Sequence, residues 1–185
     1  YIQRMTEKGM QEEAMAETVR LHQDAEQARD KYGLACGEMC IGYNHRVFGN
    51  NVKLCIENYN NALKLFEEGS YYRDAYVVLL NIIQTYLSRS EYAEAGEYLS
   101  KLSQLEDKLN SKQLSIDSSL HLRFCEFWVI GLLANEGRKA AEPYIEETDR
   151  FYRQHPESST PEAWFGYKIM CCRILGDLKG NIAYV

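Results

Sequence analysis

Cysteine and histidine are the side chains most typical of metal sites and activated nucleophiles, and this chain has six cysteines and four histidines. They are Cys36, Cys40, Cys55, Cys125, Cys171, Cys172, His22, His45, His121 and His155. No two cysteines have the Cys-x-x-Cys spacing of a zinc or redox motif, and the histidines are scattered along the chain. We therefore expect reduced core thiols, no metal site and no cofactor, with a disulfide as the alternative.

Acidic clusters, "EAGE" at 94–97 and "EETD" at 146–149, are the candidates for acid–base catalysis. Both fall on the polar face of a predicted helix, where charged side chains ordinarily face water. The sequence has no phosphate-binding glycine motif and no Gly-x-Ser-x-Gly elbow. We therefore predict no catalytic residues and do not expect this chain to be an enzyme. A helical enzyme domain is the less favoured alternative.

Composition narrows the class of protein further. Hydrophobic residues make up 45 % and charged residues 26 % of the 185 residues, as in folded proteins. A net charge of −6 argues against a nucleic-acid partner, since nucleic-acid binding needs a basic face. The longest apolar run, 127–134, is far shorter than the roughly 20 residues that span a bilayer. Tyr1 is not an initiator methionine, so we expect a piece of a longer polypeptide, either cytoplasmic or the extracytoplasmic part of a membrane-anchored sensor.

The elements that would position any site are predicted to be helices. Only three prolines occur, and Ala, Leu, Glu, Lys and Gln are abundant, which favours an all-α fold. Apolar residues at steps of three and four, together with Ser, Thr and Gly at the breaks, predict the helix ends. The expected helices are 5–31, 33–47, 51–68, 71–88, 91–109, 117–134, 138–154 and 161–175, with a further one beginning at the end of the chain. Pro143 should make its helix start late or kink.

A recurring pattern connects these helices. The small, large, apolar triplet Ala95, Leu99, Leu102 has counterparts that begin at Leu21 and Cys55. Short polar breaks between the helices favour antiparallel neighbours. We therefore predict a single domain over 1–185, with hairpins at 33–68, 71–109 and 117–154 and flanking helices at 5–31 and 161–185.

The stretch "LLNIIQTYLSRSEYAEAGEYLSKL", residues 79–102, resembles a tetratricopeptide repeat (TPR). The residues that match its two helices are Leu79, Ile82, Ile83 and Tyr86, then Tyr92, Ala95, Leu99 and Leu102. Two of the family's marker residues, Trp and Gly, are replaced by Leu79 and Ile83, and Asp107 stands in place of the closing proline. The resemblance implies an α-α superhelix, a TPR-like solenoid that binds a protein or peptide on its concave face. In bacteria, similar arrays form the sensor or scaffold part of signalling proteins such as two-component sensor histidine kinases and transcriptional regulators.

If that geometry holds, six residues line the concave, partner-binding face: Glu38, Ile41, Asn81, Gln84, Glu126 and Val129. Asn81 and Gln84 interrupt an apolar helix, and carboxamides both donate to and accept from a peptide backbone. The alternative is that these two side chains simply face water. The two glutamates favour a ligand that carries Lys or Arg beside apolar anchors. A rival interpretation is an intracellular peptide-pheromone receptor-like regulator, and the oligomeric state stays open.

Overall fold

The structure is a computed structural model that describes residues 2–49 and 51–176. Over these residues it contains helices and no strand, so the all-α prediction is confirmed. The elements are α1 (Ile2–Glu7), α2 (Gln11–Ala28), α3 (Lys31–Asn44), the π-helical turn η1 (His45–Gly49), α4 (Val52–Glu68), α5 (Tyr72–Leu87), α6 (Tyr92–Ser111), α7 (Ser118–Asn135), α8 (Arg138–Gln154), the 3₁₀ turn η2 (Pro156–Ser158) and α9 (Pro161–Ile174). No helix in these ranges has both the length and the apolar character that a membrane crossing needs.

Side-chain caps mark the starts of α3, α4, α7 and α9. Thr160 Oγ1 accepts a hydrogen bond from the Ala163 backbone N–H at 3.2 Å, and Pro161 occupies the first helical position, as predicted. The predicted helix 5–31 is wrong in one respect, because Gly9 with φ 74° separates α1 from α2. Pro143 lies inside α8, which nevertheless begins at Arg138 and so does not start late. The further helix expected at the end of the chain lies outside the described residues.

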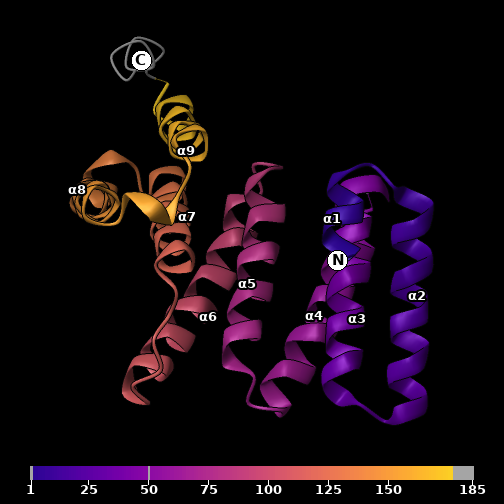
Figure 1. Cartoon of the computed structure of the whole chain (residues 1–185). Coiled ribbons are helices and arrows are strands. Elements are labelled where there is room, and N and C mark those ends of the chain that lie inside the picture. Colours follow the sequence, from indigo (N-terminus) through magenta and orange to yellow (C-terminus); the bar gives the residue numbers. More distant parts are fainter. Residues whose placement is uncertain (1, 50, 177–185) are drawn as a thin grey trace. The chain divides into compact units, whose positions relative to one another are not determined.

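The chain divides into two compact units, Tyr1–Thr85 and Tyr86–Val185. In the first unit α2, α3 and α4 lie side by side, each antiparallel to the next, with α3 in the middle (Figure 1). The close approach of α3 to α4 requires a glycine, since a Cβ at Gly42 would lie 2.8 Å from the Tyr59 ring. The predicted hairpin 33–68 therefore corresponds to the packed pair α3 and α4.

A buried polar chain joins three helices of the first unit. Thr6 Oγ1 donates to Asn44 Oδ1 at 2.8 Å, and Asn44 Nδ2 donates to Thr18 Oγ1 at 3.0 Å. The Thr18 hydroxyl donates in turn to the Ala14 carbonyl oxygen at 2.7 Å. Because all of these side chains are buried and hydrogen-bonded, they fix α1, α2 and α3 together without leaving an unpaired polar group.

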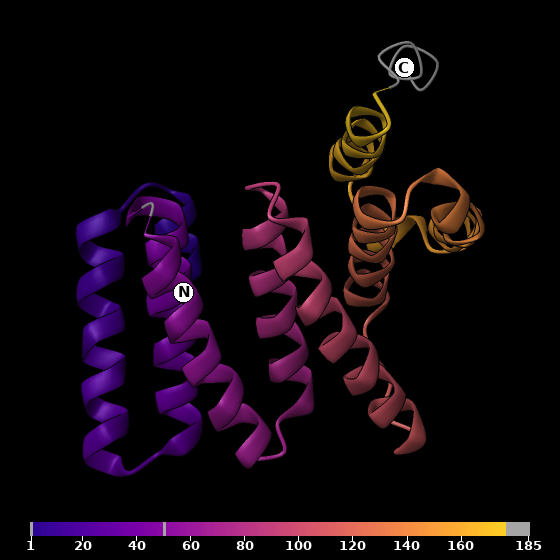
Figure 2. The same ribbon diagram turned by 180° about the vertical axis from the view of Figure 1, so that it is seen from behind.

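In the second unit α7 packs against α6, α8 and α9. Its core includes Ala95, Leu102 and Leu122, which are almost fully buried. The predicted hairpin 117–154 keeps α7 and α8 in contact, but α8 lies across α7 and not antiparallel beside it (Figures 1 and 2). The hairpin 71–109 spans the boundary between the units. Its pairing, and the single domain over 1–185, stay predictions.

Candidate functional site

Four of the six predicted site residues lie in the first unit. Glu38 and Ile41 are on α3, Asn81 and Gln84 are on α5, and all four are half-buried. Glu38 is engaged within the chain: Oε1 lies 3.3 Å from His22 Nε2 and Oε2 accepts from Asn61 Nδ2 at 3.4 Å. Glu38 therefore joins α2, α3 and α4, while its availability to a partner stays a prediction.

The other two predicted residues, Glu126 and Val129, lie on α7 in the second unit. Val129 has no exposed surface, so it belongs to the core of this unit and does not itself form a free surface. The sequence spacing predicted that Val129 and Glu126 share one helix face. In the structure Val129, three positions after Glu126, lies on the buried side of α7. A concave face that combines all six residues stays a prediction.

Glu126 opens into a pocket of about 450 Å³ within the second unit, which we call the Glu126 pocket. One wall comes from α7 and the other from η2 and the start of α9. The lining residues are Ser119, Leu120, Leu122, Arg123, Glu126, Glu157, Ser158, Ser159, Thr160 and Ala163. Leucine and alanine give the pocket apolar surface, and serine and threonine hydroxyls give it a polar rim. Such a mixture suits a side chain with an apolar stem and a polar head.

The Glu126 carboxyl group is the acidic group that α7 contributes to this pocket. Its Oε1 atom is buried and has no hydrogen-bond partner in the described part of the chain. Burial raises the pKa of this carboxyl from its ordinary value of 4.5 to about 7, although the nearby Arg123 guanidinium acts to lower it. A carboxyl group that is about half ionised at neutral pH and has one oxygen without a donor among the described residues can accept a cationic ligand.

Sequence reasoning identified Glu126 but missed the rest of this pocket. Its far wall, residues 157–160 and 163, lies between the predicted helices 138–154 and 161–175 and at the start of the second, where no site was predicted. The spacing of Arg123 and Glu126, three residues apart on one helix, was a usable signal because such residues share a face. The contact between α7 and η2, in contrast, is visible only in the fold.

In comparisons with known proteins, no family model, no curated protein and no solved structure matches this chain. The tetratricopeptide resemblance of residues 79–102 therefore stays a prediction.

Proposed function

We propose that this chain is a non-catalytic protein- or peptide-binding helical module, and that the Glu126 pocket receives a basic side chain of the partner. Two observations support the proposal: the buried Glu126 Oε1 atom has no hydrogen-bond partner among the described residues, and Glu126 lines a pocket. As the resemblance implies, we place such a module in the sensor or scaffold part of a bacterial signalling protein.

A basic ligand satisfies the chemistry of this site better than a neutral one. A buried, ionised carboxylate is costly unless a charged donor pairs with it, and a Lys or Arg head supplies both the charge and the N–H groups. Leu120 and Ala163 line the same pocket and can contact the methylene stem of that side chain. The net charge of −6 also speeds the encounter with a basic partner.

The charge state of Glu126 predicts a pH dependence for this binding. The nearby groups are Arg123 on its own helix, Glu157 of η2 in the lining of the same pocket, and Tyr167 of α9, whose pKa Glu126 helps to raise. Because the free pocket has a Glu126 pKa of about 7, the carboxylate fraction rises between pH 6 and pH 8. A ligand that needs the carboxylate should therefore bind about tenfold more tightly at pH 8 than at pH 6.

The test uses short acetylated peptide amides, each with one arginine between apolar residues, and matched peptides with citrulline in place of arginine. Calorimetry at pH 8 should show that the arginine peptides bind the wild-type chain and that Glu126→Gln weakens them roughly ten- to hundredfold. The citrulline peptides should bind weakly to both proteins. The matched control is Glu146→Gln, the same change at an exposed position of α8 outside the pocket.

Equal binding of arginine and citrulline peptides would contradict the proposed role of the pocket. So would a loss in Glu146→Gln as large as the loss in Glu126→Gln, since this would indicate a general effect of net charge. Circular dichroism of both variants checks that neither result comes from unfolding.

A further inference from the structure

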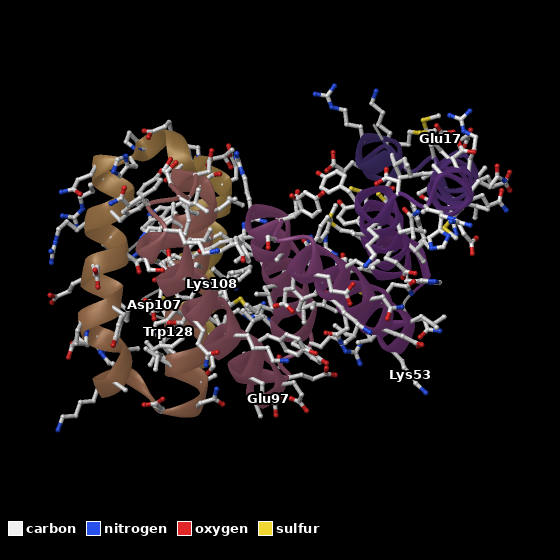
Figure 3. All side chains as sticks on the ribbon, turned by 90° about the horizontal axis from the view of Figure 1, so that it is seen from below. Glu17, Lys53, Glu97, Asp107, Lys108 and Trp128 are labelled. Atoms are coloured by element: carbon white, nitrogen blue, oxygen red, sulfur yellow. The ribbon has the colours of Figure 1, made fainter. Side chains whose placement is uncertain are left out.

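A second pocket of the second unit has a volume of about 280 Å³ and a largely aromatic wall. We call it the aromatic pocket; it is lined by Ser103 of α6, by His121, Phe124, Cys125 and Trp128 of α7, and by Tyr144, Glu147 and Thr148 of α8. Trp128, labelled in Figure 3, lies on the side of α7 that meets α8, and its ring is 6.4 Å from that of Tyr144 between centroids. None of these residues lines the Glu126 pocket.

Three side chains form a relay at this pocket. Cys125 Sγ lies 3.6 Å from His121 Nε2, and His121 Nδ1 lies 2.6 Å from Glu106 Oε1. Cys125 and His121 are four residues apart on α7, while Glu106 comes from α6 and is almost fully buried. A thiol, an imidazole that can exchange its proton and a carboxylate that orients the imidazole are the parts of an activated cysteine.

The imidazole of this relay is held in its charged form. The Cys125 sulfur and the Glu106 carboxylate together raise the pKa of His121 to about 10, against the opposing effect of burial. From α8, Glu147 and Tyr144 also line the pocket, and the Phe151 ring packs edge-on against the imidazole with centroids 4.8 Å apart. An imidazolium whose Nε2–H points at a sulfur stabilises a thiolate and can later release a proton to a leaving group.

We propose that Cys125 is a reactive thiol whose sulfur is oxidised by an apolar organic hydroperoxide bound in the aromatic pocket. The sulfur attacks the distal, hydroxyl oxygen: an S–O bond forms, the O–O bond breaks, and the electron pair leaves with the proximal oxygen. This alkoxide takes the proton from His121 Nε2 and departs as an alcohol. The sulfur loses two electrons and becomes a sulfenic acid, while the hydroperoxide is reduced.

Features of the pocket favour this reaction over acyl transfer. Acyl transfer needs N–H donors that point at a developing oxyanion. The residues that line this pocket lie inside three helices, so their backbone N–H groups are already bonded within those helices. Peroxide reduction needs only a sulfur nucleophile and a proton donor for the leaving oxygen, and the Cys125 sulfur lies 3.6 Å from His121 Nε2. Among the described residues no second cysteine lines the pocket, so each chain reacts once and the sulfenic acid awaits an external thiol.

The experiment treats the folded 185-residue chain at pH 7.5 with cumene hydroperoxide in the presence of dimedone, which traps sulfenic acids. Mass spectrometry then gives the labelling rate at each cysteine. Cys36 and Cys40 are internal controls because they are half-buried like Cys125, and burial raises the pKa of both thiols, that of Cys40 to about 11. Cys125 should be labelled at least about tenfold faster than either control. Cys125 should also react faster with cumene hydroperoxide than with hydrogen peroxide, because hydrogen peroxide has no apolar group that the aromatic side chains could bind.

Two variants test the relay itself. His121→Gln should slow labelling of Cys125 by about a hundredfold and leave Cys36 unchanged. Glu106→Gln keeps an acceptor for Nδ1 but removes the charge, and it should slow the labelling of Cys125 about tenfold. This variant tests the relay even if His121→Gln fails to fold. The proposal is overturned if wild-type Cys125 reacts no faster than Cys36 and Cys40, or if Cys125 in folded Glu106→Gln reacts as in the wild type. Equal rates with both peroxides would remove the selective role of the aromatic wall.

Discussion

The carboxyl of Glu126 should make the stability of the second unit depend on pH. Its pKa is about 7 in the folded chain against an ordinary 4.5, so between these values the folded chain holds a proton that the unfolded chain has lost. The free energy of unfolding therefore falls as pH rises from 4.5 to 7 and levels off above that. Each unit of pKa shift corresponds to about 1.4 kcal/mol, so the free energy of unfolding of the wild type should fall by an amount on the order of 3 kcal/mol over this pH range. The Glu126→Gln variant should not show this fall, because glutamine does not ionise.

Tryptophan fluorescence can follow this effect because both tryptophans, Trp128 and Trp164, lie in the second unit. Urea unfolding of the wild type and Glu126→Gln at pH 4.5, 6, 7 and 8 should give a difference that grows with pH in favour of the variant. Glu146→Gln, exposed on α8, should follow the wild type. If the wild-type and Glu126→Gln stabilities run parallel from pH 4.5 to 8, the carboxyl is not held in its neutral form and the reasoning from burial is refuted.

Other substitutions test packing and the predicted concave face. Gly42→Ala should destabilise the first unit by about 1–3 kcal/mol in urea unfolding followed by circular dichroism, because its Cβ would lie 2.8 Å from the Tyr59 ring. An equally stable variant would mean that α3 and α4 separate at little cost. Ala95→Leu should cost a similar amount, since Ala95 is fully buried, and an unchanged midpoint would contradict this. Replacing Asn81 and Gln84 together by alanine should preserve the helical content but lose partners captured from a lysate of the source cell. Retention of every partner would show that these carboxamides do not contribute to binding.

Local signals were sufficient to predict most helices. The expected helix 138–154 has the same bounds as α8, and 51–68 differs from α4 by one residue. Asn51 caps the start of α4, Gly69 follows its end, and Gly137 precedes α8, so the sequence contains these local signals directly. The sequence did not predict the break between α1 and α2, because the helical spacing of the few apolar residues continues across Gly9.

The candidate sites were harder to predict, since helix packing assembles them. The spacing of His121 and Cys125 by four residues was a usable signal, but Glu106 reaches the imidazole only because α6 packs against α7. Val129 shows the reverse error: a residue chosen for a surface role is fully buried. A periodic pattern gives the faces of one helix and leaves open which face its neighbours cover.

Both proposed sites depend on α7, and its geometry explains why they can be tested separately. Cys125 and Glu126 are consecutive residues, so their side chains leave the helix about 100° apart. The first lines the aromatic pocket and the second lines the Glu126 pocket, and within the described part of the chain the two pockets share no lining residue. Leu122, Val129 and Ile130 anchor the same helix in the core. A substitution that keeps this core intact, such as Glu126→Gln, should therefore alter peptide binding while leaving the oxidation rate of Cys125 unchanged, because only a shift of the whole helix would change both.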